Sequence, residues 1–96
     1  MILVGRDVLD GAGKAHRGQR LDKALAVWAK VVEEARWKHF SDVRQSSPSA
    51  VKGFVVFNIK GNQFRLVAKI NYKSGVLTVE KVMTHAEYDR WSENLK

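Results

Sequence analysis

The sequence has no cysteine and no long hydrophobic run. Without cysteine the chain can form neither disulfides nor thiolate metal sites, and it suits a reducing cytoplasm. The apolar start, Met1–Val4, is too short for the core of a signal peptide, and no stretch approaches the ~20 apolar residues of a membrane span. We therefore expect a soluble, cytoplasmic protein with no membrane partner.

Metal-binding side chains are also scarce. The three histidines, His16, His39 and His85, lie far apart in the sequence, and none has metal-ligand spacing from another or from a carboxylate pair. We expect no metal site and no cofactor. A chain of 96 residues supports one hydrophobic core, so we expect a single domain spanning residues 1–96.

Acidic residues are outnumbered by basic ones. Ten Asp and Glu stand against 17 Lys and Arg, which gives a net charge of +7. The excess is concentrated in residues 52–81, where six basic residues face Glu80 alone and the local net charge is 6 − 1 = +5. Concentrated positive charge attracts polyanions, most often nucleic acid. A lysine-rich surface that is merely solvated would have the same composition, so both interpretations stay open.

The first half of the chain has helical periodicity. Residues 6–17 are weakly helical, because glycine interrupts their apolar side. Over residues 20–35 apolar side chains recur every three or four positions, as in an amphipathic helix. Trp28 lies in this stripe, and we assign it to the core rather than to base stacking. Residues 36–52 follow no period, and residues 46–49 indicate a loop.

The second half of the chain has strand-like alternation, and a short strand is also expected at residues 2–4. Thr84 and Glu87 have the spacing of a capping box, which predicts a last helix through Trp91. The expected order is βααβββα, an α+β fold whose small, mostly antiparallel sheet packs against the helices. The last three strands are expected at Phe54–Ile59, Phe64–Tyr72 and Val76–Met83. Tight turns join them into a meander.

The alternating sequence of the middle strand predicts that its two faces differ. Alternation directs Phe64, Leu66 and Ile70 toward the helices, whereas Arg65 and Lys69 point the other way. The Cβ atoms of the two cations would be roughly 13 Å apart at ~3.3 Å per residue. Their side chains could converge on one phosphate or bracket neighbouring ones. The outer face of an α+β sheet also carries charges when it is only solvated.

Two segments of the chain resemble the HigB family of toxins. Residues 56–70 (VFNIKGNQFRLVAKI) are similar to the central hairpin of that family, and residues 83–89 (MTHAEYD) to its C-terminal motif. The upstream pattern is also similar at Trp37, Asp42-Val43-Arg44 and Ser49-Ala50, so the resemblance covers most of residues 21–91. It implies a RelE-like fold, a small, mostly antiparallel sheet with helices on one side.

The resemblance also implies a function. Such a protein is the toxin of a type II toxin–antitoxin system, an endoribonuclease that needs no metal and cleaves mRNA while it is translated. Its implied partners are mRNA, the decoding site of the ribosome, and a helix-turn-helix, HigA-like antitoxin. The alternative is a non-catalytic RNA- or ribosome-binding module, or an inactive relative of the toxin, which uses the same basic sheet face.

RNA cleavage without a metal requires side chains that deprotonate the ribose 2′-hydroxyl, stabilise the phosphorane and protonate the leaving 5′-oxygen. Arg65 offers a planar fork for phosphate oxygens, and His85 can act as an acid or a base. Lys69 adds charge, and Tyr88, one helical turn after His85, could donate a hydrogen bond or stack on a base. The predicted catalytic residues are Arg65, His85, Lys69 and Tyr88.

The predicted RNA-binding residues overlap with this set and are Lys60, Arg65, Lys69 and Lys81. Structural interpretations compete with these roles. His85 at a helix start could only shape the cap, Tyr88 could close the edge of the core, and Lys60 beside a turn could be a solvated tip. Arg65 is the strongest candidate, because a central-strand arginine without a partner is costly.

Overall fold

The computed structural model of the chain describes residues 1–43, 49–51, 53–61 and 63–95. One five-stranded sheet has the strand order β1-β5-β4-β3-β2. The elements in chain order are β1 (Ile2–Val4), α1 (Arg6–Ala15), the 3-10 helix η1 (Arg17–Gln19), α2 (Leu21–Glu34), α3 (Phe40–Val43), β2 (Ser49–Val51), β3 (Phe54–Ile59), β4 (Phe64–Asn71), β5 (Val76–Thr84) and α4 (His85–Asn94).

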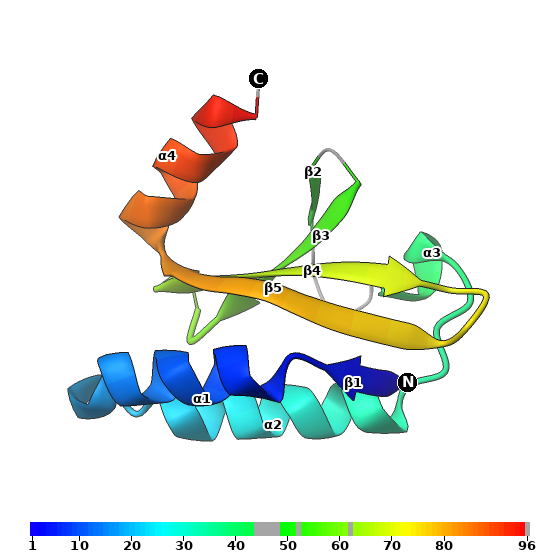
Figure 1. The fold of residues 1–96 in the computed structure, drawn as a ribbon, viewed down its shortest axis with the longest axis horizontal. Helices are drawn as coiled ribbons and strands as arrows, with labels where there is room; N and C mark the ends of the chain where they lie inside the picture. Colours follow the sequence, from blue (N-terminus) through cyan, green and yellow to red (C-terminus); the bar gives the residue numbers. More distant parts are fainter. Residues whose placement is uncertain (44–48, 52, 62, 96) are drawn as a thin grey trace.

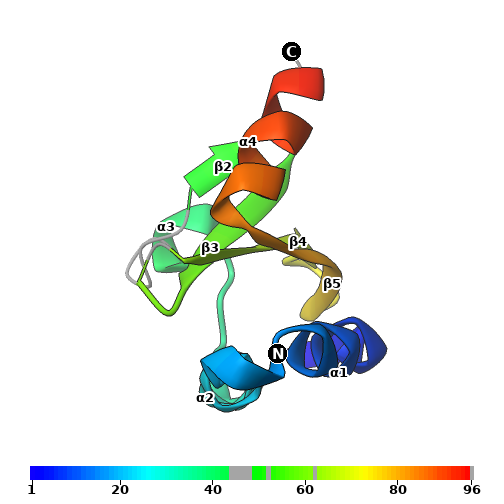
Figure 2. The same ribbon diagram turned by 90° about the vertical axis from the view of Figure 1, so that its left-hand side faces the viewer.

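The two long helices and the C-terminal helix lie on opposite sides of the sheet. Helices α1 and α2 run side by side below the strands, and α4 rises from the end of β5 on the other side (Figures 1 and 2). Strands β2, β3, β4 and β5 pair antiparallel, whereas β1 pairs parallel with β5. The expected α+β fold, with its meander and N-terminal strand, is confirmed.

Three short elements were not expected, η1, α3 and β2. The loop predicted at residues 46–49 lies outside the described residues except for Ser49, which begins β2. This strand extends the sheet beyond β3, so the loop prediction was wrong at its last residue. A three-residue strand carries too little periodicity to be recognised in sequence, and it is defined by its pairing with β3.

The face of the sheet that α1 and α2 cover holds the main hydrophobic core. Phe64, Leu66 and Ala68 on β4 are buried there, and Ile70 packs against the same cluster, so the predicted register is confirmed. Trp28 of α2 lies edge-on to Phe57, with ring centroids 5.3 Å apart, and is therefore a core residue as expected.

The link from β1 to α1 passes very close to β5. Gly5 has φ +98, and a Cβ atom there would lie 2.8 Å from the carbonyl oxygen of Val79. Any side chain would collide with that backbone, and the left-handed conformation also favours glycine. Gly5 is therefore required for the first helix to turn back beneath the sheet.

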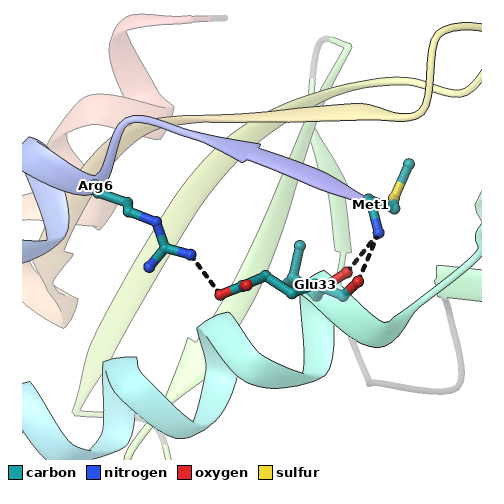
Figure 3. A network of polar contacts seen from close by, with 4 residues as sticks. Met1, Arg6 and Glu33 are labelled. Atoms are coloured by element: carbon teal, nitrogen blue, oxygen red, sulfur yellow. Dashed lines mark hydrogen bonds and ion pairs between the residues drawn. The ribbon is translucent and has the colours of Figure 1, made fainter.

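Polar contacts hold the start of the chain against the end of α2 (Figure 3). The amino group of Met1 donates to the carbonyl oxygens of Val32 (2.9 Å) and Glu33 (3.2 Å). The Arg6 guanidinium forms an ion pair with the Glu33 carboxylate. These contacts fix β1 and the first turn of α1 relative to α2.

Strand β5 contains a bulge. Val67 pairs with Lys81, but the next residue of β4, Ala68, pairs with Val79, so Glu80 is an extra residue on β5. The bulge shifts the alternation of β5 by one residue. Lys81 therefore shares the face of its partner Val67, opposite α1 and α2, where strict alternation from Val79 would place it in the core.

Candidate functional site

The sheet face opposite α1 and α2 carries a second, smaller apolar cluster. Val56, Val67 and Met83 are buried there, with Phe54, Tyr88 and Trp91 partly buried around them. The Trp91 ring lies edge-on to Phe54, with centroids 5.3 Å apart, and tilted against Tyr88 at 5.9 Å. This face is therefore not simply a solvated surface. Its apolar cluster holds α4 on the sheet.

Arg65 lies at the edge of this cluster. Its guanidinium carbon is 5.4 Å from the centroid of the Tyr88 ring, within range of a cation–π contact, and one terminal nitrogen is 3.4 Å from Nδ1 of His85. Its Nε is buried and has no hydrogen-bond partner among the residues that the structure describes. A buried donor without a partner costs about 1–3 kcal/mol, so this arginine is poorly explained by stability alone.

His85 is held at the first position of α4 by backbone and capping bonds. Its backbone N–H donates to the carbonyl oxygen of Gln63 (3.2 Å). Beside it the predicted capping box is confirmed: the Glu87 N–H donates to Oγ1 of Thr84 (3.2 Å), and the Thr84 N–H donates to Oε1 of Glu87 (2.9 Å). The start of α4, and with it His85, is therefore anchored to the end of the β3–β4 hairpin.

The capping box also acts on the Glu87 carboxylate. Hydrogen bonds from the backbone and then the side chain of Thr84 hold the pKa of Glu87 below its ordinary value, with smaller contributions from His16 and Arg90. Glu87 is therefore ionised throughout the neutral range. Its negative charge also interacts favourably with the positive end of the helix dipole.

The surroundings of His85 determine its tautomer. An arginine nitrogen can only donate, so Nδ1 must be the accepting nitrogen in the neutral ring. The ring proton is then on Nε2, which lies 3.6 Å from Oδ2 of Asp89, one helical turn further on. Asp89 was not among the predicted site residues. Its i, i+4 spacing from His85 is the signal that could have identified it.

The lysines extend the positive charge of this face. Lys69 is exposed on β4, with its ammonium nitrogen 4.9 Å from the centroid of the Phe54 ring. Lys81 is exposed opposite Val67, on the face where the bulge of β5 places it. The structure therefore brings Arg65, Lys69 and Lys81 to one face, which we call the cationic face.

Lys60 lies apart from the cationic face. It occupies the β3–β4 turn, and its ammonium group donates to the carbonyl oxygen of Gln19 in η1. Of the predicted site residues, Arg65 contacts both His85 and Tyr88, and Lys60 is held against the turn between α1 and α2 instead.

A cavity of about 560 Å³ lies elsewhere, between α1 and α2. Leu9, Leu25 and Ala29 line it together with charged residues of the same two helices and of η1, and none of its lining residues comes from the sheet or α4. In the described parts of the chain, no three acidic or histidine side chains gather in a way that could hold a metal ion. No described helix is both long and apolar enough to cross a membrane.

Comparison with known proteins identifies the family that this chain resembles. A family model described as the HigB toxin, the RelE-like toxic component of a toxin–antitoxin system, matches residues 21–91. A 34-residue segment is 47% identical to the mRNA interferase toxin HigB of Escherichia coli K12, and equally to the mRNA interferases HigB of E. coli O157:H7 and Shigella flexneri. The segment is 35% of this chain and spans only 33% of the length of each relative.

Proposed function

The chain belongs to the HigB toxin family, the RelE-like toxic component of a toxin–antitoxin system, and on that premise we propose that it is a metal-independent endoribonuclease that cleaves mRNA. The family implies an antitoxin partner. The observation that carries the proposal is the contact between Arg65 and His85 on the cationic face. It joins a phosphate-binding group to a proton-transferring group, the two functions that RNA cleavage by side chains needs.

In the proposed reaction, the ribose 2′-oxygen attacks the adjacent phosphorus as a base removes its proton. The bond from phosphorus to the 5′-oxygen breaks, and that oxygen takes a proton from an acid. The products are a 2′,3′-cyclic phosphate and a 5′-hydroxyl. His85 serves one of the two proton transfers, and Arg65 binds the phosphate oxygens whose charge grows in the transition state.

The contacts of His85 suit this role. In the free protein its Nδ1 lone pair faces Arg65, and a phosphate that draws the guanidinium toward itself would release Nδ1 for a proton of the substrate. Asp89 lies on the Nε2 side, with its Oδ2 3.6 Å away. The Tyr88 ring, which packs against Trp91, contacts the Arg65 guanidinium and could also stack on a base of the RNA.

Lys69 and Lys81 would bind the RNA backbone beside the scissile phosphate, on the side of Arg65 away from His85. Both are exposed on the cationic face, and each could neutralise a backbone phosphate. Binding should therefore weaken as salt rises, because each phosphate contact releases condensed counterions. Affinity that stays constant between low and high salt would contradict a phosphate-binding face.

The proposed setting is the cytoplasm, where translated mRNA and ribosomes are found. We propose that the toxin reaches mRNA in the ribosomal decoding site and that a helix-turn-helix, HigA-like antitoxin neutralises it. The names of the E. coli and Shigella relatives, mRNA interferases, support the choice of mRNA as substrate.

The test is a translation-coupled cleavage assay with mapping of the RNA ends. Wild-type protein should produce 2′,3′-cyclic phosphate ends in translated message. Arg65→Ala should lower the single-turnover rate about a hundredfold or more, as expected for the loss of ~3–4 kcal/mol of charge stabilisation. His85→Ala should lower it roughly 10²–10⁴-fold.

Two controls accompany this assay. Lys73→Ala removes a cation from the exposed β4–β5 turn, away from the cationic face, and should cleave like wild type. Thermal melting of each variant separates a catalytic loss from unfolding. If wild-type protein protects the message without cutting it, the chain is an RNA- or ribosome-binding module. Full activity of Arg65→Ala at unchanged stability would remove Arg65 from the site.

A further inference from the structure

Two residues other than glycine have a positive φ in the described chain, and both are cations. Arg20 has φ 55 and Lys60 has φ 53. Glycine occupies the other described positions with positive φ. A side chain is disfavoured in this conformation, and basic side chains are not among those that tolerate it best. Residues kept in such a conformation are candidates for a function that needs their side chain.

These two cations belong to the same corner of the molecule. The Lys60 ammonium donates to the carbonyl oxygen of Gln19, the residue before Arg20. This bond joins the β3–β4 turn to the turn between α1 and α2. Figure 1 shows both turns at the left-hand end of the molecule, and Figure 2 faces that end.

The corner lies at the same end of the sheet as the candidate active site, on the face that α1 and α2 cover. The His16 ring, just before η1, lies edge-on to Phe64 with centroids 4.9 Å apart. Phe64 directly precedes Arg65, and the neighbouring Gln63 accepts the backbone bond of His85. The charge of His16 also acts on Glu87 at the start of α4, so a strand of RNA that leaves the cationic face and passes around this end of the sheet would meet the corner next.

The corner is rich in basic residues, although Asp10 and Asp22 line the cavity that Arg17 also lines. Residues 14–20 contain three Lys or Arg residues and no acidic residue. Arg17 and Arg20 are exposed, and neither forms an ion pair within the described part of the chain. We define Arg17, Arg20 and Lys60 as the corner cluster.

We propose that the corner cluster is a second phosphate-binding site, which takes the RNA backbone a few nucleotides away from the scissile phosphate. The proposal deepens the proposed function and rests on its claim that the cationic face binds RNA. The Lys60–Gln19 bond ties the two turns together and so keeps the backbone positions of the three cations close to one another. It would lengthen the bound segment of RNA without touching the reacting atoms.

Arg20→Gly offers a sharp test, because conformation and charge predict opposite results for it. Glycine suits the left-handed backbone of this position, so the variant should melt at a higher temperature than wild type. If the charge binds phosphate, the same variant should bind RNA more weakly. Arg17→Gln removes the second charge, and Arg36→Gln, an exposed arginine beyond the other end of α2, is the matched control.

The probes are two fluorescent single-stranded RNAs that 2′-O-methyl groups make uncleavable. One has about 12 nucleotides, enough to fill a typical single-strand binding site, and the other has about 3, too few to fill one. For the longer RNA, the combined Arg17→Gln and Arg20→Gly variant should flatten the slope of log affinity against log salt by about 1.4, or ~0.7 for each lost contact. The shorter RNA should bind it as it binds wild type.

The outcomes separate this inference from the proposed function. An unchanged salt slope for the longer RNA would overturn the corner site even if the enzyme cleaves mRNA normally. Equal loss for both RNAs would also overturn it, since the corner would then belong to the central site. A flattened slope in a protein that cuts no RNA would support the corner site while the proposed endoribonuclease activity fails.

Discussion

The two faces of the sheet differ in how many hydrophobic residues they bury and in how much charge they carry. The face beneath α1 and α2 contributes to a core of 14 buried residues, and the face beneath α4 to a cluster of three. The large core consists of packed hydrophobic side chains and holds no buried charged side chain in the described residues. The small cluster is bordered by Arg65 and the lysines. Stability is thus concentrated on one face, which leaves the other free to carry charge that a core could not accept.

The largest effect on this comparison should come from the large core. Leu66→Ala should lower the free energy of unfolding by about 2–5 kcal/mol, because Leu66 is fully buried at the centre of β4 and leaves a cavity. Chemical denaturation measures the change. Leu66→Met, which nearly conserves volume, should cost less than about 1.5 kcal/mol. Equal costs for the two variants would show that the face is not tightly packed.

A smaller loss of stability, with a larger loss of function, is expected in the small cluster. Met83→Ala should cost about 2 kcal/mol, the low end for such a truncation, because Met83 is at the edge of burial with 8% of its surface exposed. It should also slow RNA cleavage, because the cluster positions α4 and therefore His85 and Tyr88. Melting and single-turnover cleavage are measured on the same samples, with Met83→Leu as control. Cleavage at the wild-type rate would show that α4 needs no support from this cluster.

The N-terminal cap of α4 should contribute less again. Thr84→Ala should cost about 1 kcal/mol, since it removes the side chain that caps Glu87. The lowered pKa of Glu87 means that its contribution is present above the unfolded value of 4.5 and is lost as pH falls through the lower folded value. Glu87 is exposed, so solvent screening keeps the contribution small.

The pH dependence of Glu87→Gln checks this assignment. Wild type should be slightly more stable than this variant at neutral pH, and the two stabilities should converge as the solution is acidified below pH 4.5. Denaturation curves at a series of pH values provide the measurement. A difference that grows on acidification would mean that the carboxylate is not stabilised by the cap.

The smallest effect is expected at the ion pair between Arg6 and Glu33. Both side chains are about half exposed, so their coupling should not exceed ~1 kcal/mol. A double-mutant cycle with Arg6→Ala and Glu33→Ala measures it directly. A coupling well above that limit would show that the surface ion pair between α1 and α2 contributes free energy of unfolding that we assign to the hydrophobic core.

The sequence predicted the elements whose signal is local. The period-two pattern placed Phe54–Ile59 correctly, and the capping box at Thr84 located the start of α4. The helical stripe found α2 within a residue at each end. These features depend on neighbours within a few positions, so a single sequence contains them in full.

What the sequence did not predict depends on contacts between distant segments. Nothing local indicates that Trp91 packs on Phe54, and so the apolar cluster beneath α4 was missed. The corner likewise arises from a bond between Lys60 and Gln19, which are 41 residues apart. The grouping of Arg65, His85 and Tyr88 was proposed from family resemblance and from the chemistry of RNA cleavage, and the structure supplies the contacts of Arg65 with the other two.

The bulge at Glu80 makes β5 two short strands with independent phases. Before it, the pleat is set by Leu77 and Val79 in the large core, and after it by Met83 in the small cluster. Deleting Glu80 would not exchange inside and outside for the residues that follow, because Val79 and Lys81 would then alternate regularly opposite Ala68 and Val67. The length of the strand can therefore change by one residue at the bulge, and an added residue in the exposed turn at Lys73 would likewise leave both phases intact.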